Sequence, residues 1–310
     1  MQQTTQHIMM VRPVSFGYNP QTAENNAFQK QMPQDTQVLA KAQAEFDGMV
    51  NMLQAAGVDV LVFNDTPQPP KPSAVFPNNW VSFHEEGIVI LYPMYAPNRR
   101  EERQEEILIG IEKKFSKQIL LDFSPYETMG KYLESTGSMI IDRPNKLIYA
   151  CRAERTHEQI LQIVAEKLEY QYLLFDARDE NQQLIYHTNV MMCMGIDFAV
   201  ICLEAITNAQ ERQQVVEALQ KTGKQIVEIS QDQVKQFAGN MLEVTNAKGE
   251  RLLVMSERAF KSLTPEQVNT LEKSVRIVAP PLYTIEDYEG GSARCMMAEI
   301  FLPLKEEVAG

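Results

Sequence analysis

The sequence predicts an α/β fold in which five pseudo-symmetric ββαβ units surround a central channel, as a single domain over residues 1–310. Two observations lead to this prediction. Short β-rich runs recur in close pairs, and each pair is followed by a helical pattern and a further β-rich run. The repeat length of about fifty to sixty residues lies in the range of repeat architectures. The alternative is an ordinary α+β sheet whose strands have this spacing by coincidence.

Four units follow one another along the chain, and the two ends of the chain form the fifth. Turn residues such as Glu85-Glu86-Gly87 separate the paired runs, which indicates hairpins. In the fifth unit, residues 295–301 pair with 8–11, before a helix over 35–56 and a strand over 58–63. The internal units, each given as two paired strands, a helix and a closing strand, are 80–84, 88–92, 99–115 and 118–123; 139–141, 147–151, 156–168 and 172–175; 190–194, 198–204, 208–222 and 225–229; and 241–244, 251–255, 264–273 and 275–278. Thr156 is the predicted N-cap of its helix.

Composition is typical of globular domains, with 44% hydrophobic and 23% charged residues. The formal net charge is −12, and an acidic surface repels phosphate groups, so nucleic acid is not expected as a partner. The apolar region 190–206 is interrupted by Gly195, Asp197 and Glu204, so no membrane span is expected.

The N-terminal residues and the cysteines predict a cytoplasmic protein. Residues 1–7 have neither a basic start nor an apolar core, so we expect no signal peptide. The four cysteines, at 151, 193, 202 and 295, form no CxxC pair, so neither a zinc ribbon nor a redox pair is predicted. The sequence leaves open whether the protein forms a homo-oligomer.

Cys295 is a candidate nucleophile because it ends the segment GGSARC. The two glycines allow sharp turns, and Arg294 places a cation next to the thiol, which are conditions that favour a reactive thiolate. His187 and Glu134 each lie in a polar loop that leads into an apolar strand. The three residues begin equivalent hairpins of three units, so they would converge on one channel. A buried structural cysteine, a capping histidine and a solvated glutamate are the alternatives.

With these residues the chain resembles the guanidino-group-modifying superfamily of five-bladed α/β propellers, the penteins, which includes arginine deiminases, dimethylarginine hydrolases and amidinotransferases. The resemblance covers nearly the whole chain. The segments MVRP at 10–13 and NPQTA at 19–23 look most like the amidinotransferase-related hydrolases linked to citrulline utilization. The resemblance implies a hydrolase whose partner is a small ureido or guanidino amino acid.

The resemblance also implies roles for individual residues. Cys295 matches the catalytic cysteine, His187-Thr188-Asn189 matches a catalytic His-x-Asp segment, and Glu134 opens a match to Glu-Gly-Gly-Asp with a one-residue insertion. A Pro-Asn-x-x-Phe-x-Arg-Asp segment corresponds to residues 77–84, so Asn78 would help hold the substrate α-carboxylate. Arg155 matches a carboxylate-binding arginine, and Arg99 or Arg100 matches a second, of which Arg100 is our prediction.

Two departures from the superfamily pattern concern the substrate. Arginine-using members hold the guanidinium between two aspartates, and here those positions are His84 and Asn189. A buried guanidinium without paired anions is poorly stabilised, whereas a neutral ureido group finds both donors and acceptors in an amide and an imidazole. The resemblance therefore favours citrulline over arginine, unless a shifted alignment places Glu85 or Glu86 there.

The mechanism expected from this pattern is hydrolysis through a covalent thioester. The thiolate of Cys295 attacks the ureido carbon, with Arg294 either favouring the thiolate or pointing away. His187 protonates the departing amine and then activates water, and Glu134 orients the reacting nitrogens. Asn78 and Arg155 hold the α-carboxylate. We expect no metal or organic cofactor, because the thiol supplies the covalent chemistry.

Three alternatives stay open at this point. The first is another reaction of the same superfamily, which means arginine deimination, a dihydrolase reaction or amidino transfer. The second is a non-catalytic propeller that only binds a partner. The third is a cysteine hydrolase of unrelated fold, against which the repeat spacing is the main argument.

Overall fold

The computed structural model describes residues 1–26, 28–31 and 36–305, and its strands form five three-stranded sheets within those ranges. In every sheet the middle strand pairs antiparallel with one neighbour and parallel with the other. The sheets, each with its middle strand second and its parallel strand last, are β15 (Ala298–Glu299), β1 (His7–Arg12) and β2 (Asp59–Asn64); β3 (Val81–Phe83), β4 (Ile88–Leu91) and β5 (Ile119–Asp122); β6 (Met139–Asp142), β7 (Leu147–Cys151) and β8 (Gln171–Phe175); β9 (Met192–Met194), β10 (Phe198–Ile201) and β11 (Gln225–Glu228); and β12 (Leu242–Thr245), β13 (Arg251–Val254) and β14 (Arg276–Val278). The five predicted units are confirmed, including the one that joins the two ends of the chain.

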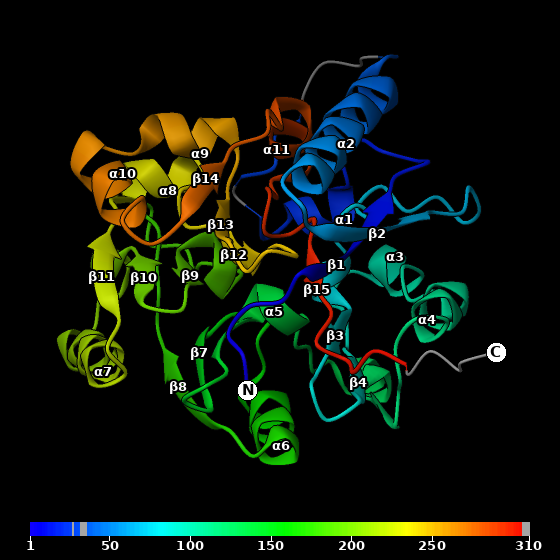
Figure 1. Cartoon of the computed structure of the whole chain (residues 1–310). Helices are drawn as coiled ribbons and strands as arrows, with labels where there is room; N and C mark the ends of the chain where they lie inside the picture. The colour runs from blue at the N-terminus through cyan, green and yellow to red at the C-terminus, as the bar shows by residue number, and fades with distance from the viewer. Residues whose placement is uncertain (27, 32–35, 306–310) are drawn as a thin grey trace.

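Helices connect the parallel strands of each sheet, because parallel strands need a long crossover. They are α2 (Val38–Ala55); α3 (Pro97–Arg100) and α4 (Glu105–Glu112); α6 (Glu158–Leu168); α7 (Ala209–Lys221); and α9 (Glu257–Ser262) and α10 (Pro265–Leu271). Figure 1 shows α2, α4, α6, α7 and α10 at the periphery of the molecule. Asp35, the first residue of the predicted helix 35–56, lies outside the described residues.

The five sheets follow one another around the middle of the molecule (Figure 1). Their first strands contact each other, since β15 meets β3 and β9 meets both β6 and β12. These strands are therefore the innermost ones, and the segments that lead into them reach the centre. Complete closure of the ring stays a prediction.

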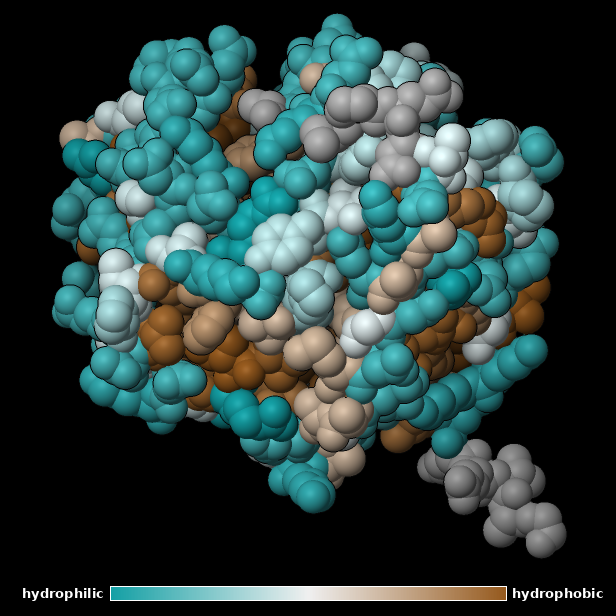
Figure 2. Space-filling view, turned by 90° about the horizontal axis from the view of Figure 1, so that it is seen from above, coloured by the Kyte–Doolittle hydropathy of each residue, from teal (hydrophilic) through white to brown (hydrophobic). Residues whose placement is uncertain are grey.

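Apolar side chains fill the space between neighbouring sheets. One cluster joins Met9 of β1 to Val81 of β3, and another joins Ile90 of β4 to Met139 of β6. Hydrophilic side chains cover most of the face seen from above, and apolar ones gather mainly in patches across the lower half of the view (Figure 2). Within the described ranges, no helix has the length and apolarity needed to cross a bilayer.

The structure differs most from the sequence prediction in the segments where the chain enters the innermost strands. Short helical turns precede three of them, namely η1 (Pro77–Asn79), α5 (Ser135–Ser138) and η3 (Thr188–Val190). The predicted strand 295–301 is reduced to β15, because the amides of Cys295 and Met296 bond to carbonyls three residues earlier, at 3.0 and 3.2 Å. The side chains on these turns therefore do not follow the alternation of a strand.

Two helix predictions also need correction. The helix predicted over 99–115 is two helices, with Glu102 turned back so that its carboxylate holds Arg99 at 2.8 and 2.9 Å. The N-cap of α6 is His157, whose Nδ1 accepts from the amide of Gln159 at 3.2 Å, and not Thr156. The remaining elements are α1 (Pro20–Ala23), η2 (Ser124–Met129), η4 (Leu203–Ala205), α8 (Gln231–Lys235) and α11 (Tyr283–Glu289).

Candidate active site

Each of the five units contributes one polar side chain from the segment that enters its innermost strand. In chain order these side chains are Asn79, Glu134, His187, Asn240 and Cys295. All are buried. The sequence predicted three of the five, and the predicted convergence of Glu134, His187 and Cys295 agrees with this arrangement. Asn79 and Asn240 were missed, although each occupies the equivalent place in its own unit.

A small pocket lies at this centre, with a volume of about 20 Å³. Its lining includes Cys295, His187, Asn79, Arg99, Arg155 and Glu289. A space of this size holds about one water molecule. The candidate nucleophile therefore lines a very narrow pocket.

Glu134 and His187 form a hydrogen bond of 2.8 Å between Oε2 and Nε2. Burial alone raises the pKa of Glu134, but Arg155, His187 and Arg99 outweigh it and hold that pKa well below its ordinary value. Burial lowers the pKa of His187 to about 4, although the hydrogen bond that His187 donates to Glu134 acts in the opposite direction. Glu134 is thus ionised and accepts only, so Nε2 of neutral His187 carries the proton and Nδ1 is left as the basic nitrogen.

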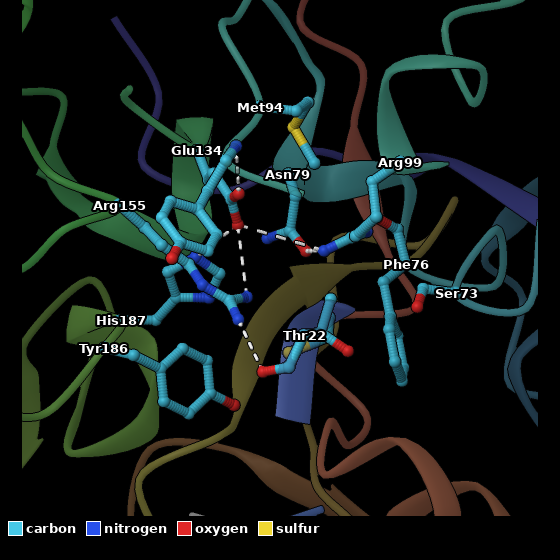
Figure 3. Close-up of polar contacts among 12 residues, drawn as sticks. Thr22, Ser73, Phe76, Asn79, Met94, Arg99, Glu134, Arg155, Tyr186 and His187 are labelled. Carbon is cyan, nitrogen blue, oxygen red and sulfur yellow. Dashed lines mark hydrogen bonds and ion pairs between the residues drawn. The ribbon is translucent and has the colours of Figure 1, made fainter. Parts of the chain in front are cut away.

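Two buried arginines surround the Glu134 carboxylate (Figure 3). Arg155 Nη1 and Arg99 Nη1 lie 3.5 and 3.9 Å from its Oε2. The remaining donors of Arg155 reach the N-terminal segment, where the carbonyl of Thr22 accepts at 3.0 Å and Asn25 Oδ1 accepts from both Nε and Nη2. Arg99 also donates to Asn79 Oδ1 at 2.9 Å. The carboxylate is therefore fixed from several sides, and with it the histidine.

Two amide side chains contact the thiol of Cys295. Asn240 Nδ2 lies 3.2 Å from Sγ and Asn189 Nδ2 lies 3.6 Å from it. Asn240 also accepts from the backbone amide of Arg294 at 3.1 Å, which ties it to the cysteine turn. The Arg294 guanidinium points away, toward Glu299 at 2.7 Å, so it does not face the thiol. Donors to the sulfur come from amides and not from a neighbouring cation.

The other three cysteines are held as neutral thiols. Burial raises the pKa of Cys151 to about 11 and the pKa values of Cys193 and Cys202 to about 12. None of them lines the central pocket. These surroundings are those of buried packing residues.

Four of the five predicted substrate-binding residues do not line the pocket, and three of these four have their side chains bonded elsewhere. Asn78 is turned to Thr136 at 3.3 Å, and Arg100 is bonded to the carbonyls of Met94 and Tyr95 at 3.1 and 3.3 Å. In both cases the neighbour in sequence, Asn79 or Arg99, faces the pocket instead. The reason is that successive side chains in a helical turn point about 100–120° apart, so an error of one residue changes the direction completely.

His84 is the third of these residues. Its Nε2 lies 2.8 Å from Ser82 Oγ, and its Nδ1 lies 3.4 Å from the guanidinium of Arg143. Burial lowers its pKa well below the ordinary value, with a further contribution from Arg143. His84 therefore belongs to the packing behind the β3–β4 hairpin, and only Asn189 of the two departures lies beside the thiol.

Replacing Gly137 by alanine is expected to lower activity about 100-fold with little change in fold. A Cβ at this position in α5 would lie 2.4 Å from Asn79 Nδ2 and 2.9 Å from Nδ1 and Cε1 of His187, so one of these must move. The measurement is kcat/KM beside the circular dichroism spectrum. Gly48→Ala in α2 is the control, because its Cβ meets nothing within 4 Å and only helix propensity changes. Full activity of the Gly137 variant would show that this part of the pocket is not involved.

Residues 12–302 match the family model described as N,N dimethylarginine dimethylhydrolase, eukaryotic. The chain belongs to this family. It is a pentein of the guanidino-modifying superfamily, as the sequence indicated. No curated protein matches it in sequence.

Solved structures share the fold at low sequence identity. ArgZ, an arginine dihydrolase from the ornithine–ammonia cycle in cyanobacteria, gives a TM-score of 0.74 at 16% identity, over 97% of this chain and 42% of that longer chain. The N-terminal domain of ArgZ, covalently bound to a reaction intermediate, gives 0.71 at 16% identity over 96% of this chain and 98% of that one. A dimethylarginine dimethylaminohydrolase adduct with S-methyl-L-thiocitrulline gives 0.65 at 14% identity, over 96% and 100%.

Proposed function

We propose that the protein hydrolyses the ureido group of citrulline to ornithine, carbon dioxide and ammonia. The Cys295 thiol transfers its proton to Nδ1 of His187, and the thiolate attacks the ureido carbon. His187 returns the proton to the δ-nitrogen as the C–N bond breaks, which releases ornithine and leaves a carbamoyl thioester. Water, deprotonated by His187, then cleaves the C–S bond and yields carbamate, which decomposes to carbon dioxide and ammonia.

The observation that carries the choice of substrate is the pair of amides at the thiol. A guanidinium at the thiol would lie against Asn189 and Asn240, which bear no charge, and beside a pocket that is lined by the cations of Arg99 and Arg155. The carboxylate of Glu134 is already shared among His187 and both arginines. A neutral ureido oxygen can instead accept from an amide N–H, which also favours the oxyanion formed during attack.

Arg155 is our proposed partner for the substrate carboxylate. Asn25 Oδ1 now accepts from Nε and Nη2, which together form the edge that a carboxylate takes in a bidentate pair. Small-molecule sites usually enclose about 300–1,000 Å³. The present pocket is far smaller, so we expect the segment with Thr22 and Asn25 to move when substrate binds. The closed five-unit ring over residues 1–310 is the scaffold that we propose for this site.

The second candidate is an arginine dihydrolase or a related guanidine hydrolase. Its support is the likeness to ArgZ and to the dimethylarginine dimethylaminohydrolase, which leaves the reacting group open at this sequence identity. Both candidates use the same nucleophile and differ in the first group that leaves.

Assays of citrulline, arginine and dimethylarginine, with ornithine, citrulline and ammonia measured separately, are expected to show ornithine formation from citrulline as the main activity. Asn189→Asp should lower kcat/KM for citrulline about tenfold or more, because it places a carboxylate beside the thiolate, and should raise the relative rate with arginine. Asn208→Asp, a change of the same type at an exposed helix N-cap, is the matched control. A wild-type preference for arginine would overturn the citrulline proposal and favour the dihydrolase.

A further inference from the structure

Glu289 is a buried carboxyl group in the pocket lining that the proposed mechanism does not use. It ends α11 and is 3% exposed. Its Oε2 accepts a hydrogen bond of 2.5 Å from the hydroxyl of Ser73. Its Oε1 has no hydrogen-bond partner within the described residues. A buried polar atom left in this state costs free energy unless a ligand or water completes it.

The hydrogen bonds around Ser73 fix the roles of the two carboxyl oxygens. Asn19 Nδ2 donates to Ser73 Oγ at 2.9 Å, so the single hydroxyl proton of Ser73 is free to go to Glu289 Oε2. Oε2 is therefore an acceptor in either protonation state, and a proton bound by Glu289 resides on Oε1. Asn26 Nδ2 also donates to the backbone carbonyl of Glu289 at 3.1 Å, which holds the end of the helix in place. The unpartnered Oε1 therefore belongs to a side chain whose position is fixed by these hydrogen bonds.

Among the described residues, two side chains of the pocket lining have a buried polar atom without a hydrogen-bond partner. These two atoms lie in different surroundings. Asn79 Nδ2, a donor, is near the His187 ring, since both lie within 2.9 Å of the same point above Gly137. Glu289 Oε1, which accepts once the carboxyl group is ionised, belongs to the group with Ser73 and Asn26. A ligand that satisfies both needs an acceptor at its reacting end and a donor elsewhere along its length.

The charge state of Glu289 indicates what kind of donor group the ligand needs there. Burial raises the pKa of Glu289 to about 8, with Glu102 acting in the same direction and the cations of Arg99 and Arg155 opposing it. At pH 7 the group is therefore mainly neutral and adds no charge to the two arginines. A cationic donor brought next to Oε1 favours the ionised carboxylate, so its binding releases a proton.

We propose that Glu289 is the specificity-determining residue for the α-ammonium group of the substrate, which donates to Oε1, while Ser73 and Asn19 position the carboxyl group. This inference rests on the proposed function, because an amino acid carries an ammonium group next to the carboxylate that Arg155 binds. It deepens that function by selecting α-amino acids over ureido acids that lack the amino group.

The test measures ligand binding by isothermal titration calorimetry in the full-length Cys295→Ala protein, which cannot turn the ligands over. The ligands form two pairs that differ only in the amino group, namely citrulline and 5-ureidopentanoate, and arginine and 5-guanidinopentanoate. Each is compared in Cys295→Ala and in Cys295→Ala with Glu289→Gln. Titration in buffers of different ionisation enthalpy counts the protons released, a readout that a merely structural residue would leave unchanged.

The expected result is that loss of the amino group weakens citrulline binding tenfold or more with Glu289 present and less than threefold with Glu289→Gln. Citrulline binding at pH 7 should release a proton only in the first background. Glu217→Gln removes an exposed carboxylate from α7, away from the central pocket, and should behave as the parent does. An amino-group effect that is equal in both backgrounds overturns the proposal, as does a failure of all four ligands to bind.

The two proposals can fail separately in this experiment. If only the arginine pair binds and shows the amino-group effect, the citrulline function is wrong and the role of Glu289 stands. If citrulline binds and its affinity does not depend on Glu289, the function stands and the role of Glu289 is wrong.

Discussion

Replacing Cys295 by alanine is expected to abolish turnover, by about 10⁴-fold or more, while leaving the fold intact. The thiol is the covalent nucleophile of the proposed reaction, and it lines the central pocket with His187 while the amides of Asn189 and Asn240 contact its sulfur. Loss of a covalent nucleophile removes the low-energy route entirely, because nothing replaces the bond it forms. The measurements are ammonia release from citrulline and the urea unfolding midpoint.

Cys202→Ala is the matched control for this experiment. Cys202 is also fully buried, but burial raises its pKa to about 12 and it does not line the central pocket. Its removal should cost about 1 kcal/mol of stability from the small cavity and leave kcat/KM within about twofold. Residual activity of Cys295→Ala near the wild-type level, with Cys202→Ala equally active, would rule out the thioester mechanism.

The architecture could be predicted because its signals are local and repeated. Hairpins such as 139–151 combine β-branched runs with turn residues, and helices such as 158–168 show apolar residues at regular spacing. The turns before the innermost strands could not be predicted in this way. Elements of three or four residues, such as η1 and α5, are too short to show any period.

The same limit explains which site residues were found. Glu134, His187 and Cys295 have side chains whose chemistry stands out in a loop, so their types indicate a role. Asn79 and Asn240 are amides, which occur in many loops for backbone reasons alone. The equivalent position in each unit is the signal that would have found them, since every innermost strand is preceded by one such residue.

Residues with a role in charge balance were hardest to predict. The sequence indicates Arg99 only as an alternative to Arg100, and it gives no signal for Glu289. Both depend on contacts with residues that are distant in sequence, Arg99 with Asn79 and Glu289 with Ser73. No spacing rule in a single sequence predicts such contacts.

Replacing Glu134 by glutamine is expected to lower kcat/KM by about 10²–10⁴-fold and the free energy of unfolding by about 3–5 kcal/mol. The amide keeps the shape of the side chain but removes the negative charge that faces Arg155 and Arg99 at 3.5 and 3.9 Å. Two buried cations then lose a counter-charge, and His187 loses the acceptor that fixes its tautomer. Stability is measured by urea unfolding and activity with citrulline.

The pH dependence of this stability loss has a definite sign. The pKa of Glu134 in the folded protein is depressed by Arg155, His187 and Arg99 although burial opposes them. The folded state therefore binds this proton less readily than the unfolded state, where the pKa is about 4.3. The stabilisation is present above that value and is lost as the pH falls toward the folded-state pKa. The difference between wild type and Glu134→Gln should accordingly shrink below about pH 4.

Glu243→Gln is the control that separates the effect of losing a buried charge on stability from the effect of losing a catalytic group on activity. Glu243 is 2% exposed, pairs with Arg251 at 2.6 Å and accepts from the amide of Ile196 at 2.8 Å, away from the central pocket. Its replacement should destabilise the fold through the same kind of broken ion pair while leaving kcat/KM within about threefold. If Glu134→Gln lost stability to a similar degree but kept activity within tenfold, Glu134 would be a structural counter-ion only. The task of holding the His187 tautomer would then have to fall to another group.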